Sequence, residues 1–283
     1  MAERSIELHL RDDLRFGVGA LDELPGMTAA AADPRAGPGG PARAFIVTDD
    51  GVRRSGVIDR VRAVLETAGF EVGLFDGVEP NPGTRSIERG SVALDGFGPR
   101  DTVVVPVGGG SAMDSAKVIS LHATNGGDIL GLGYHRADLR PGGPLVAVPT
   151  TAGTGAETNS YGVVTDEVAG RKVYIGHPSV RPVGTILDPA LTVGLPAAAT
   201  AATGVDAMTH AIESLLSRNP NPFAEGLALQ VIRTVSRWLP RAVADGADLE
   251  ARSELLVASH LAGLGQASGT GVGLVHALGH AIG

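Results

Sequence analysis

The chain has 283 residues, of which 43% are hydrophobic, and its 23 Lys and Arg against 31 Asp and Glu give a formal net charge of −8. This acidic balance argues against nucleic acid or an anionic membrane as the main partner. Because the chain has no cysteine, disulfides, cysteine nucleophiles and cysteine-bound zinc are excluded, and any metal must be held by Asp, Glu or His. The charged N-terminal stretch and the lack of a long apolar run predict a cytoplasmic enzyme.

The first forty residues carry weak structural signals. Ser5–Leu10 alternates between apolar and polar residues like a short strand, and Phe16–Leu24 passes from glycine into a helical pattern. Thr28–Arg43 is rich in alanine, glycine and proline. We predict that it is a loop and expect no function in it.

Ala44–Thr48 is a continuous apolar run that predicts a buried strand of a parallel sheet. Glu71–Phe75 and Thr102–Val107 are the second and third predicted strands. An amphipathic helix with apolar positions between Val57 and Leu65 separates the first two, and a further helical stretch precedes the third. Strands that alternate with helices are typical of an open, doubly wound (Rossmann-like) α/β sheet. Such a sheet binds ligands beyond the carboxyl ends of its strands.

A glycine-rich turn, Gly108-Gly-Gly-Ser-Ala-Met-Asp-Ser-Ala-Lys117, follows the third of these strands directly. Glycines let the backbone approach a phosphate closely, and the next helix directs its free N–H groups toward the anion. Ser111 and Asp114 have the spacing of a capping box, which predicts where that helix begins. The position after a buried strand favours a phosphate site over a plain turn, although the motif is neither GxGxxG nor a Walker loop.

The next segment continues the α/β pattern and adds a loop rich in hydroxyl groups. Leu145–Val148 is a predicted strand, and Pro149-Thr-Thr-Ala-Gly-Thr-Gly-Ala-Glu157 follows it. Its threonines suit ribose and pyrophosphate oxygens but are also compatible with an ordinary turn. Val163–Thr165 and Lys172–Ile175 form a predicted hairpin, and Thr185–Asp188 is the last predicted strand.

From about Pro196 onward the pattern is helical. The predicted helices cover residues 197–217, 223–239, 250–264 and 272–282. We therefore predict two domains, a dinucleotide-binding α/β domain over residues 1–191 and an all-α metal-binding domain over residues 192–283. Ligand sites favour domain interfaces, so we expect the active site in the cleft between them.

Two pairs of potential metal ligands lie within predicted helices. Asp206 and His210 are four residues apart, and so are His276 and His280, so each pair shares one helical face. Oxygen and nitrogen ligands without thiolate suit Fe²⁺ or Zn²⁺. Each pair alone could be a surface ion pair or a pair of core histidines. Together they favour a metal site.

Four ordered motifs resemble those of the iron-containing (group III) alcohol dehydrogenases. They are Gly108-Gly-Gly-Ser-x-x-Asp-x-x-Lys117, Pro149-Thr-Thr-Ala-Gly-Thr-Gly-x-Glu157, Ala202-Thr-Gly-Val-Asp-Ala-x-Thr-His-Ala-x-Glu213 and Gly273-Leu-Val-His-Ala-x-x-His280. The resemblance implies an NAD(P)-dependent oxidoreductase that transfers a hydride between nicotinamide and a small alcohol or its carbonyl compound.

The same resemblance assigns a metal site. It implies that Asp206, His210 and His276 bind the metal, usually Fe²⁺ and sometimes Zn²⁺, and that His280 lies beside the substrate as a catalytic, proton-relaying residue. It also implies a fourth ligand, a further histidine beyond Gly283. We therefore expect the helical domain of this chain to be incomplete at its C-terminus.

The resemblance also assigns a dinucleotide site. The residues it implies as lining the cofactor are Asn81, Gly109, Gly110, Ser111, Asp114, Thr150, Thr151, Thr154 and Lys172. Asp49, at the end of the first long strand, would accept the adenosine ribose hydroxyls and repel a 2′-phosphate, which favours NAD over NADP. Arg53 and Arg54 could instead partner that phosphate, so NADP stays possible.

Three other interpretations remain open at this point. The chain could be a metal-independent reductase of the maleylacetate reductase type, a lyase like dehydroquinate synthase, or only a nucleotide-binding fragment. Retained metal ligands argue against the first, and the threonine-rich motif favours a dehydrogenase over the second. For any of these enzymes we expect a homo-oligomer.

Overall fold

The computed structural model describes residues 13–32, 42–99 and 101–282. The described chain forms two compact units. One comprises the residues up to Thr150 together with Ser160–Leu191, and we call it the α/β unit. The other comprises Thr151–Asn159 and the residues from Thr192 onward, and we call it the helical unit. The predicted strand at Ser5–Leu10 lies outside the described residues.

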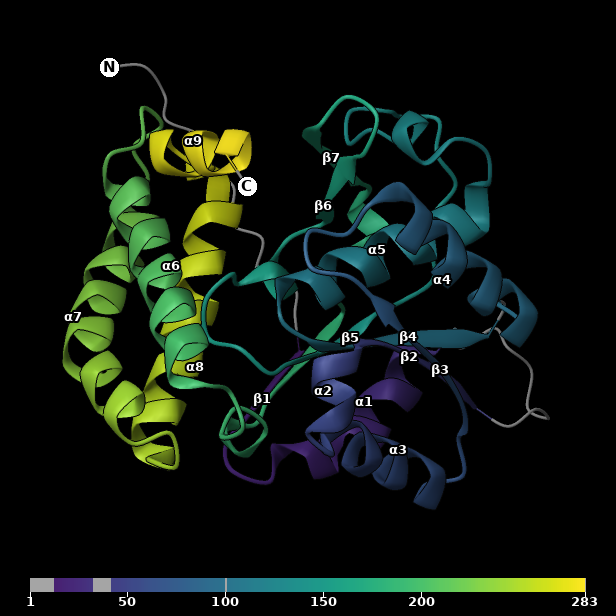
Figure 1. Ribbon diagram of the computed structural model, residues 1–283, viewed down its shortest axis with the longest axis horizontal. Helices are drawn as coiled ribbons and strands as arrows, with labels where there is room; N and C mark the ends of the chain where they lie inside the picture. Colours follow the sequence, from purple (N-terminus) through teal and green to yellow (C-terminus); the bar gives the residue numbers. More distant parts are fainter. Residues whose placement is uncertain (1–12, 33–41, 100, 283) are drawn as a thin grey trace. The chain divides into compact units, whose positions relative to one another are not determined.

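The α/β unit is built on a six-stranded sheet (Figure 1). Its strands are β1 (Asp13–Phe16), β2 (Arg43–Asp49), β3 (Glu71–Val78), β4 (Thr102–Gly108), β5 (Val146–Pro149) and β8 (Gly184–Leu187). Their order is β1-β8-β5-β4-β2-β3, and all neighbouring strands run parallel. This confirms the predicted doubly wound α/β fold.

Both faces of this sheet are covered, because side chains along a strand alternate between its two sides. In β2, Ala44 and Ile46 belong to one core cluster, and Phe45 and Val47 belong to the other. The first cluster packs under α1 (Leu24–Ala31) and α3 (Val57–Thr67), and the second under α4 (Thr84–Phe97) and α5 (Gly110–Asn125). Burial on both faces explains why these strands are continuous apolar runs in the sequence.

Smaller elements complete the α/β unit. The predicted hairpin is present as the antiparallel pair β6 (Tyr161–Asp166) and β7 (Arg171–Gly176), and a short helix, α2 (Asp50–Arg54), follows β2. Short 3-10 turns lie at Ala20–Glu23, Ile129–Gly131, Pro178–Val180 and Pro189–Leu191.

Near the N-terminus one prediction was wrong and one strand was missed. The predicted loop from Thr28 begins too early, because α1 continues to Ala31. The edge strand β1 was missed because its polar–apolar alternation covers only four residues, all of them exposed. Only pairing with β8 identifies it as a strand.

The helical unit contains four α-helices among its described residues. They are α6 (Ala197–Leu215), α7 (Pro222–Ala244), α8 (Leu249–Gly265) and α9 (Leu274–Ile282), with a π-helical turn at Gln266–Thr270 between the last two. Trp238 belongs to the core of this unit together with Val231, Val235 and Leu255. The loop Thr151–Asn159 packs closely on α8, where a Cβ at Gly155 would lie 2.7 Å from the Cα of Gly263.

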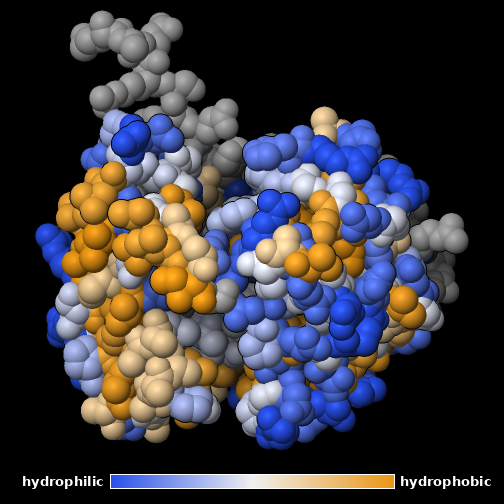
Figure 2. All heavy atoms as spheres, turned by 45° about the horizontal axis from the view of Figure 1, so that its top comes forward, coloured by the Kyte–Doolittle hydropathy of each residue, from blue (hydrophilic) through white to orange (hydrophobic). Residues whose placement is uncertain are grey.

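The helical unit exposes many apolar side chains, which Figure 2 shows as an orange area over its helices. Leu216, Leu274 and Ile282 are 77%, 73% and 86% exposed. Among the described residues, no helix combines the length and the apolar character needed to cross a bilayer.

Candidate metal centre and cofactor site

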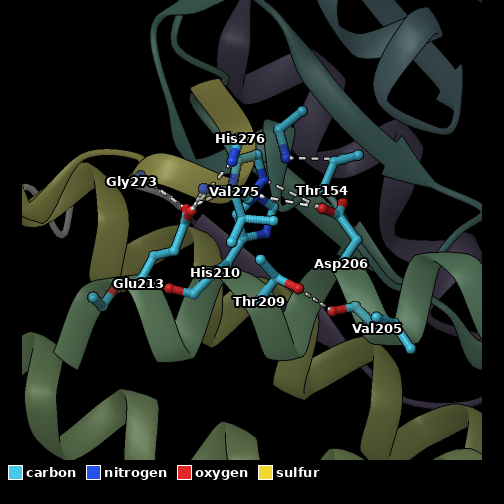
Figure 3. Close-up of polar contacts among 11 residues, drawn as sticks. Thr154, Val205, Asp206, Thr209, His210, Glu213, Gly273, Val275 and His276 are labelled. Carbon is cyan, nitrogen blue, oxygen red and sulfur yellow. Dashed lines mark hydrogen bonds and ion pairs between the residues drawn. The ribbon is translucent and has the colours of Figure 1, made fainter. Parts of the chain in front are cut away.

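Helix α6 presents the first two metal-ligand candidates. Its alanine-rich sequence favours the helix, and Gly204 lets α6 lie close to α7, since a Cβ there would meet the side chain of Leu239 at 2.4 Å. Asp206 and His210 are one turn apart and point to the same side (Figure 3). The exposed fraction of the His210 side chain is only 6%.

His276, near the start of α9, completes a cluster with these two residues. Its Nε2 lies 3.4 Å from Oδ1 of Asp206, and Nε2 of His210 lies 3.8 Å from the same oxygen. One potential ligand atom from each residue falls within 4.8 Å of the others. Ligands of a tetrahedral metal at ordinary bond lengths lie about 3.3 to 3.6 Å apart, so the donor set fits a single ion.

The pKa values of the two imidazoles in this cluster are shifted in opposite directions. Burial lowers the pKa of His210, although the Asp206 carboxylate opposes the effect. The hydrogen bond with Asp206 raises the pKa of His276, and Glu213 acts in the same direction. The rings stack with centroids 4.4 Å apart. Burial therefore favours the neutral, metal-binding form of His210, whereas the neighbouring carboxylates favour the protonated form of His276.

Glu213 holds the start of α9 against α6. Its Oε2 accepts hydrogen bonds from the backbone N–H of Gly273 at 2.8 Å and from Nδ1 of His276 at 2.5 Å. Its Oε1 accepts from the backbone N–H groups of Val275 at 2.8 Å and His276 at 3.2 Å. Burial favours the protonated acid, but the hydrogen bonds from Gly273 and His276 outweigh burial and lower the pKa of Glu213.

His280 lies one turn beyond His276 on α9 and stands apart from the three-residue cluster. The two rings are perpendicular, with centroids 6.3 Å apart. The structure thus brings together Asp206, His210 and His276, and leaves His280 beside them.

A second set of predicted residues gathers at the carboxyl edge of the parallel sheet. Asp49 ends β2, and its neighbour β4 ends at Gly108, immediately before the N-terminus of α5. A Cβ at Gly108 would lie 3.5 Å from Oδ2 of Asp49, and Gly108 accepts a hydrogen bond from the N–H of Thr150 at 2.9 Å. The chain runs from β2 outward in both directions, so this edge is the topological switch point, where such sheets bind nucleotides.

Asn81 and Lys172, from distant parts of the sequence, also meet within the α/β unit. The Nζ of Lys172 donates a hydrogen bond to Oδ1 of Asn81 at 2.8 Å. Asn81 adopts a left-handed backbone with φ of 51°. Thr151 and Thr154 belong to the helical unit, where Oγ1 of Thr154 accepts from the N–H of Ala156 at 3.3 Å.

Comparison with known proteins decides the family. The family described as "Iron-containing alcohol dehydrogenase" matches residues 12–189, and its C-terminal family, "Fe-containing alcohol dehydrogenase family, C-terminal", matches residues 200–283. The chain belongs to the iron-containing alcohol dehydrogenase family. This confirms the resemblance carried by the four motifs.

Individual relatives agree with that assignment. The chain is 38% identical to a choline dehydrogenase of Bacillus subtilis over 95% of its own length and 65% of the relative's. It is 37% identical to an NAD-dependent methanol dehydrogenase of Bacillus methanolicus over 86% of its own length and 63% of the relative's. The crystal structure of a 1,3-propanediol oxidoreductase superposes with a TM-score of 0.89 at 36% identity, covering 98% of this chain and 70% of that one. The chain thus spans about two thirds of the length of these dehydrogenases.

One prediction about the glycine-rich turn of this family member was wrong. The N-cap of α5 is Gly109, without a side-chain hydrogen bond, so Ser111 and Asp114 do not form a capping box. The carboxylate of Asp114 instead accepts a hydrogen bond from the N–H of Val163 at 3.1 Å, which ties α5 to the hairpin. Burial raises the pKa of Asp114 to about 6, against the opposing charge of Lys117.

The two arginines near Asp49 both have carboxylate partners. Arg53 pairs with Asp76, and Arg54 pairs with Asp50 at 2.7 Å. Asp49 itself caps α2, because its Oδ1 accepts from the N–H of Val52 at 3.0 Å.

Sequence reasoning assigned no role to Glu213, although it is the last residue of the third motif. The spacing of Glu213 from the two metal-ligand candidates could have indicated a role. Asp206, His210 and Glu213 are separated by four and three residues, so all three lie on one helical face.

Proposed function

We propose that this chain forms the core of an NAD-dependent, metal-dependent alcohol dehydrogenase, which interconverts a small alcohol and its aldehyde or ketone. The observation that carries the proposal is the cluster of Asp206, His210 and His276, whose ligand atoms are spaced for one ion. These residues would hold Fe²⁺ or Zn²⁺. A bound metal of this kind supplies Lewis-acid stabilisation of negative charge on the substrate oxygen.

The residues around the cluster have separate tasks in this proposal. Asp206 supplies the only anionic ligand of the three, and burial lowers the pKa of His210, which favours the neutral imidazole that a metal needs. His280 lies on the next turn of α9 from the ligand His276 and is partly exposed, so it can pass a proton between the alcohol and solvent.

The cofactor in this proposal is NAD, which supplies or accepts the hydride. Gly109 and Gly110 open α5 at the switch point, and the unpaired N–H groups of a first helical turn attract a pyrophosphate. Asp49, at the end of β2, would accept the adenosine ribose hydroxyls in this proposal, and its negative charge disfavours a 2′-phosphate. Arg53 and Arg54, which could offset that repulsion, each have another carboxylate partner, Asp76 and Asp50.

The remaining cofactor contacts stay predictions from the sequence. They are Asn81, Ser111, Asp114, Thr150, Thr151, Thr154 and Lys172. The relatives act on compounds as different as choline and methanol by name, so the substrate class proposed here is a small alcohol or its carbonyl compound. A cytoplasmic location and a homo-oligomeric state stay predictions from the sequence.

The direct test is NADH oxidation by the chain, purified without oxygen, against a panel of short aldehydes and ketones. Aliquots of one preparation are stripped with a chelator and reloaded with Fe²⁺, with Zn²⁺ or with nothing. We expect turnover only in the reloaded aliquots, and faster turnover with NADH than with NADPH. Equal turnover in the stripped aliquot would identify a metal-independent reductase. NADH binding without turnover in any aliquot would reduce the function to nucleotide binding.

A further inference from the structure

Glu213 occupies a position between the metal cluster and the start of α9. Asp206, His210 and Glu213 lie along one face of α6, and the Glu213 side chain is only 5% exposed (Figure 3). All four hydrogen bonds recorded for its carboxylate run to Gly273, Val275 and His276, that is, to the segment that carries the third metal-ligand candidate.

The contact with the His276 ring determines where the proton of that imidazole resides. A carboxylate can only accept a hydrogen bond, so Nδ1 of His276 must be the protonated nitrogen in their 2.5 Å contact. Nε2 faces a second carboxylate, Asp206, at the longer distance of 3.4 Å. When the ring is neutral, the shorter contact with Glu213 keeps the single proton on Nδ1, and Nε2 carries the lone pair. Nε2 lies on the side of the cluster where an ion would bind.

We infer that Glu213 is a positioning residue for the metal, because it fixes both the tautomer and the orientation of His276. Two backbone bonds on Oε1 and one on Oε2 hold the carboxylate, so it cannot turn away from the ring. The four bonds also join α9 to α6, which would otherwise contribute ligands as independent helices. This inference rests on the metal site of the proposed function and adds a residue that does not itself touch the ion.

The simplest competing explanation is that Glu213 only caps α9. Carboxylates at a helix N-terminus stabilise it without any role toward a metal. The two explanations differ in what happens to the His276 ring. A cap alone would leave the imidazole tautomer unaffected when the carboxylate is replaced, whereas a positioning residue controls it.

The test compares Glu213→Gln with the unaltered chain. An amide has one acceptor and one donor group in place of two acceptors, so at least two of the four bonds are lost. Two measurements are made. The ¹⁵N chemical shifts of the His276 ring, in the metal-free protein at a pH at which the ring is neutral, report which nitrogen is protonated. Titration with Zn²⁺ against a chelating dye reports the dissociation constant.

We expect the unaltered chain to show a single His276 tautomer with the proton on Nδ1, and Glu213→Gln to show a mixture. Replacing a residue that orients a metal-binding histidine typically weakens metal affinity by about 10- to 100-fold, and we expect that range here. Asp248→Asn is the matched control, because Asp248 caps α8 through the N–H of Ala251 without touching the cluster. It should change Zn²⁺ affinity by less than about twofold.

Two results would overturn the inference: an unchanged tautomer in Glu213→Gln, even with weaker Zn²⁺ binding, or unchanged Zn²⁺ affinity. Failure of the unaltered chain to bind Zn²⁺ or Fe²⁺ would instead refute the proposed metal site, and the ring measurement would still test the control of His276. The emission of Trp238, the only tryptophan, reports whether the helical unit stays folded. If Glu213→Gln unfolds it, Glu213→Asp keeps the charge on a shorter side chain and is measured in the same way.

Discussion

The two candidate sites of this protein differ in the groups that form them: side chains in one and backbone in the other. The metal cluster consists of side chains, Asp206, His210 and His276, and its geometry depends on how α9 is held on α6. The candidate nucleotide site, at the carboxyl edge of the parallel sheet, is mostly backbone. It is formed by Gly108–Gly110, where β4 is followed by α5. The metal site should therefore be sensitive to substitutions that remove a side-chain functional group. The candidate nucleotide site should be sensitive to substitutions that add a side chain.

The largest effect is expected when a ligand is removed. Asp206→Ala leaves two imidazoles without the carboxylate that balances the charge of the ion. We expect metal affinity to fall at least about 100-fold, more than for a residue that only orients a ligand, and turnover to disappear. NADH affinity should change only slightly. Metal analysis after dialysis and NADH fluorescence titration measure the two effects, with the exposed Glu254→Ala on α8 as control. Retained turnover in Asp206→Ala would refute this ligand assignment.

Adding a methyl group at Gly108, in the candidate nucleotide site, should have the next largest effect. Gly108 has φ of 152°, and a Cβ there would lie 2.7 Å from the Cβ of Ala112. We expect Gly108→Ala to lower the free energy of unfolding by about 1 to 3 kcal/mol and to weaken NADH binding. Urea unfolding followed by circular dichroism measures the first.

Gly96→Ala is the matched control for this substitution, because the residue is in α4 and, apart from its chain neighbours and the nearby backbone of that helix, no atom lies within 4 Å of the added Cβ. It should stabilise the protein by up to about 1 kcal/mol. Equal destabilisation by both substitutions would show that the close approach at Gly108 is unimportant.

Asp114 should make stability pH-dependent. Its folded pKa of about 6 lies above the ordinary value of 3.8, so the folded state binds the proton more tightly. The resulting stabilisation is complete below about pH 3.8 and is lost as the pH rises through 6. Between pH 5 and pH 8 this loss amounts to about 1 kcal/mol. Urea unfolding across this range should show a smaller pH dependence in Asp114→Asn, and identical slopes would contradict the assignment.

The smallest effect concerns the capping box that the sequence suggested. Since Ser111 caps no helix, Ser111→Ala should change the free energy of unfolding by less than about 0.5 kcal/mol. Asp248→Ala removes a true cap, whose carboxylate accepts from the N–H of Ala251, and should cost about 1 kcal/mol. Comparable losses in the two variants would restore the capping-box interpretation.

Much of the α/β unit could be predicted from the sequence because its signals are local. Ala44–Val47 and Val103–Val107 are apolar throughout, and the structure buries β2 and β4 on both faces. The edge strand β1 gave no such signal, since its side chains are exposed. Ser111 had the spacing of a cap, but helix α5 begins at Gly110, one residue before it.

The sequence by itself determined the alternation of strands and helices, and it placed Asp206 and His210 on one helical face, because these features depend only on the periodicity of a strand or a helix. Helical spacing left open which later histidine joins that pair; the family resemblance assigned His276, and the tertiary structure supplies the physical reason. His276 and His280 lie in similar apolar, helical sequence. His276 donates a hydrogen bond from Nδ1 to Glu213, which leaves its Nε2 facing Asp206. The packing of α9 on α6 depends on contacts between residues far apart in the chain, which no local pattern encodes.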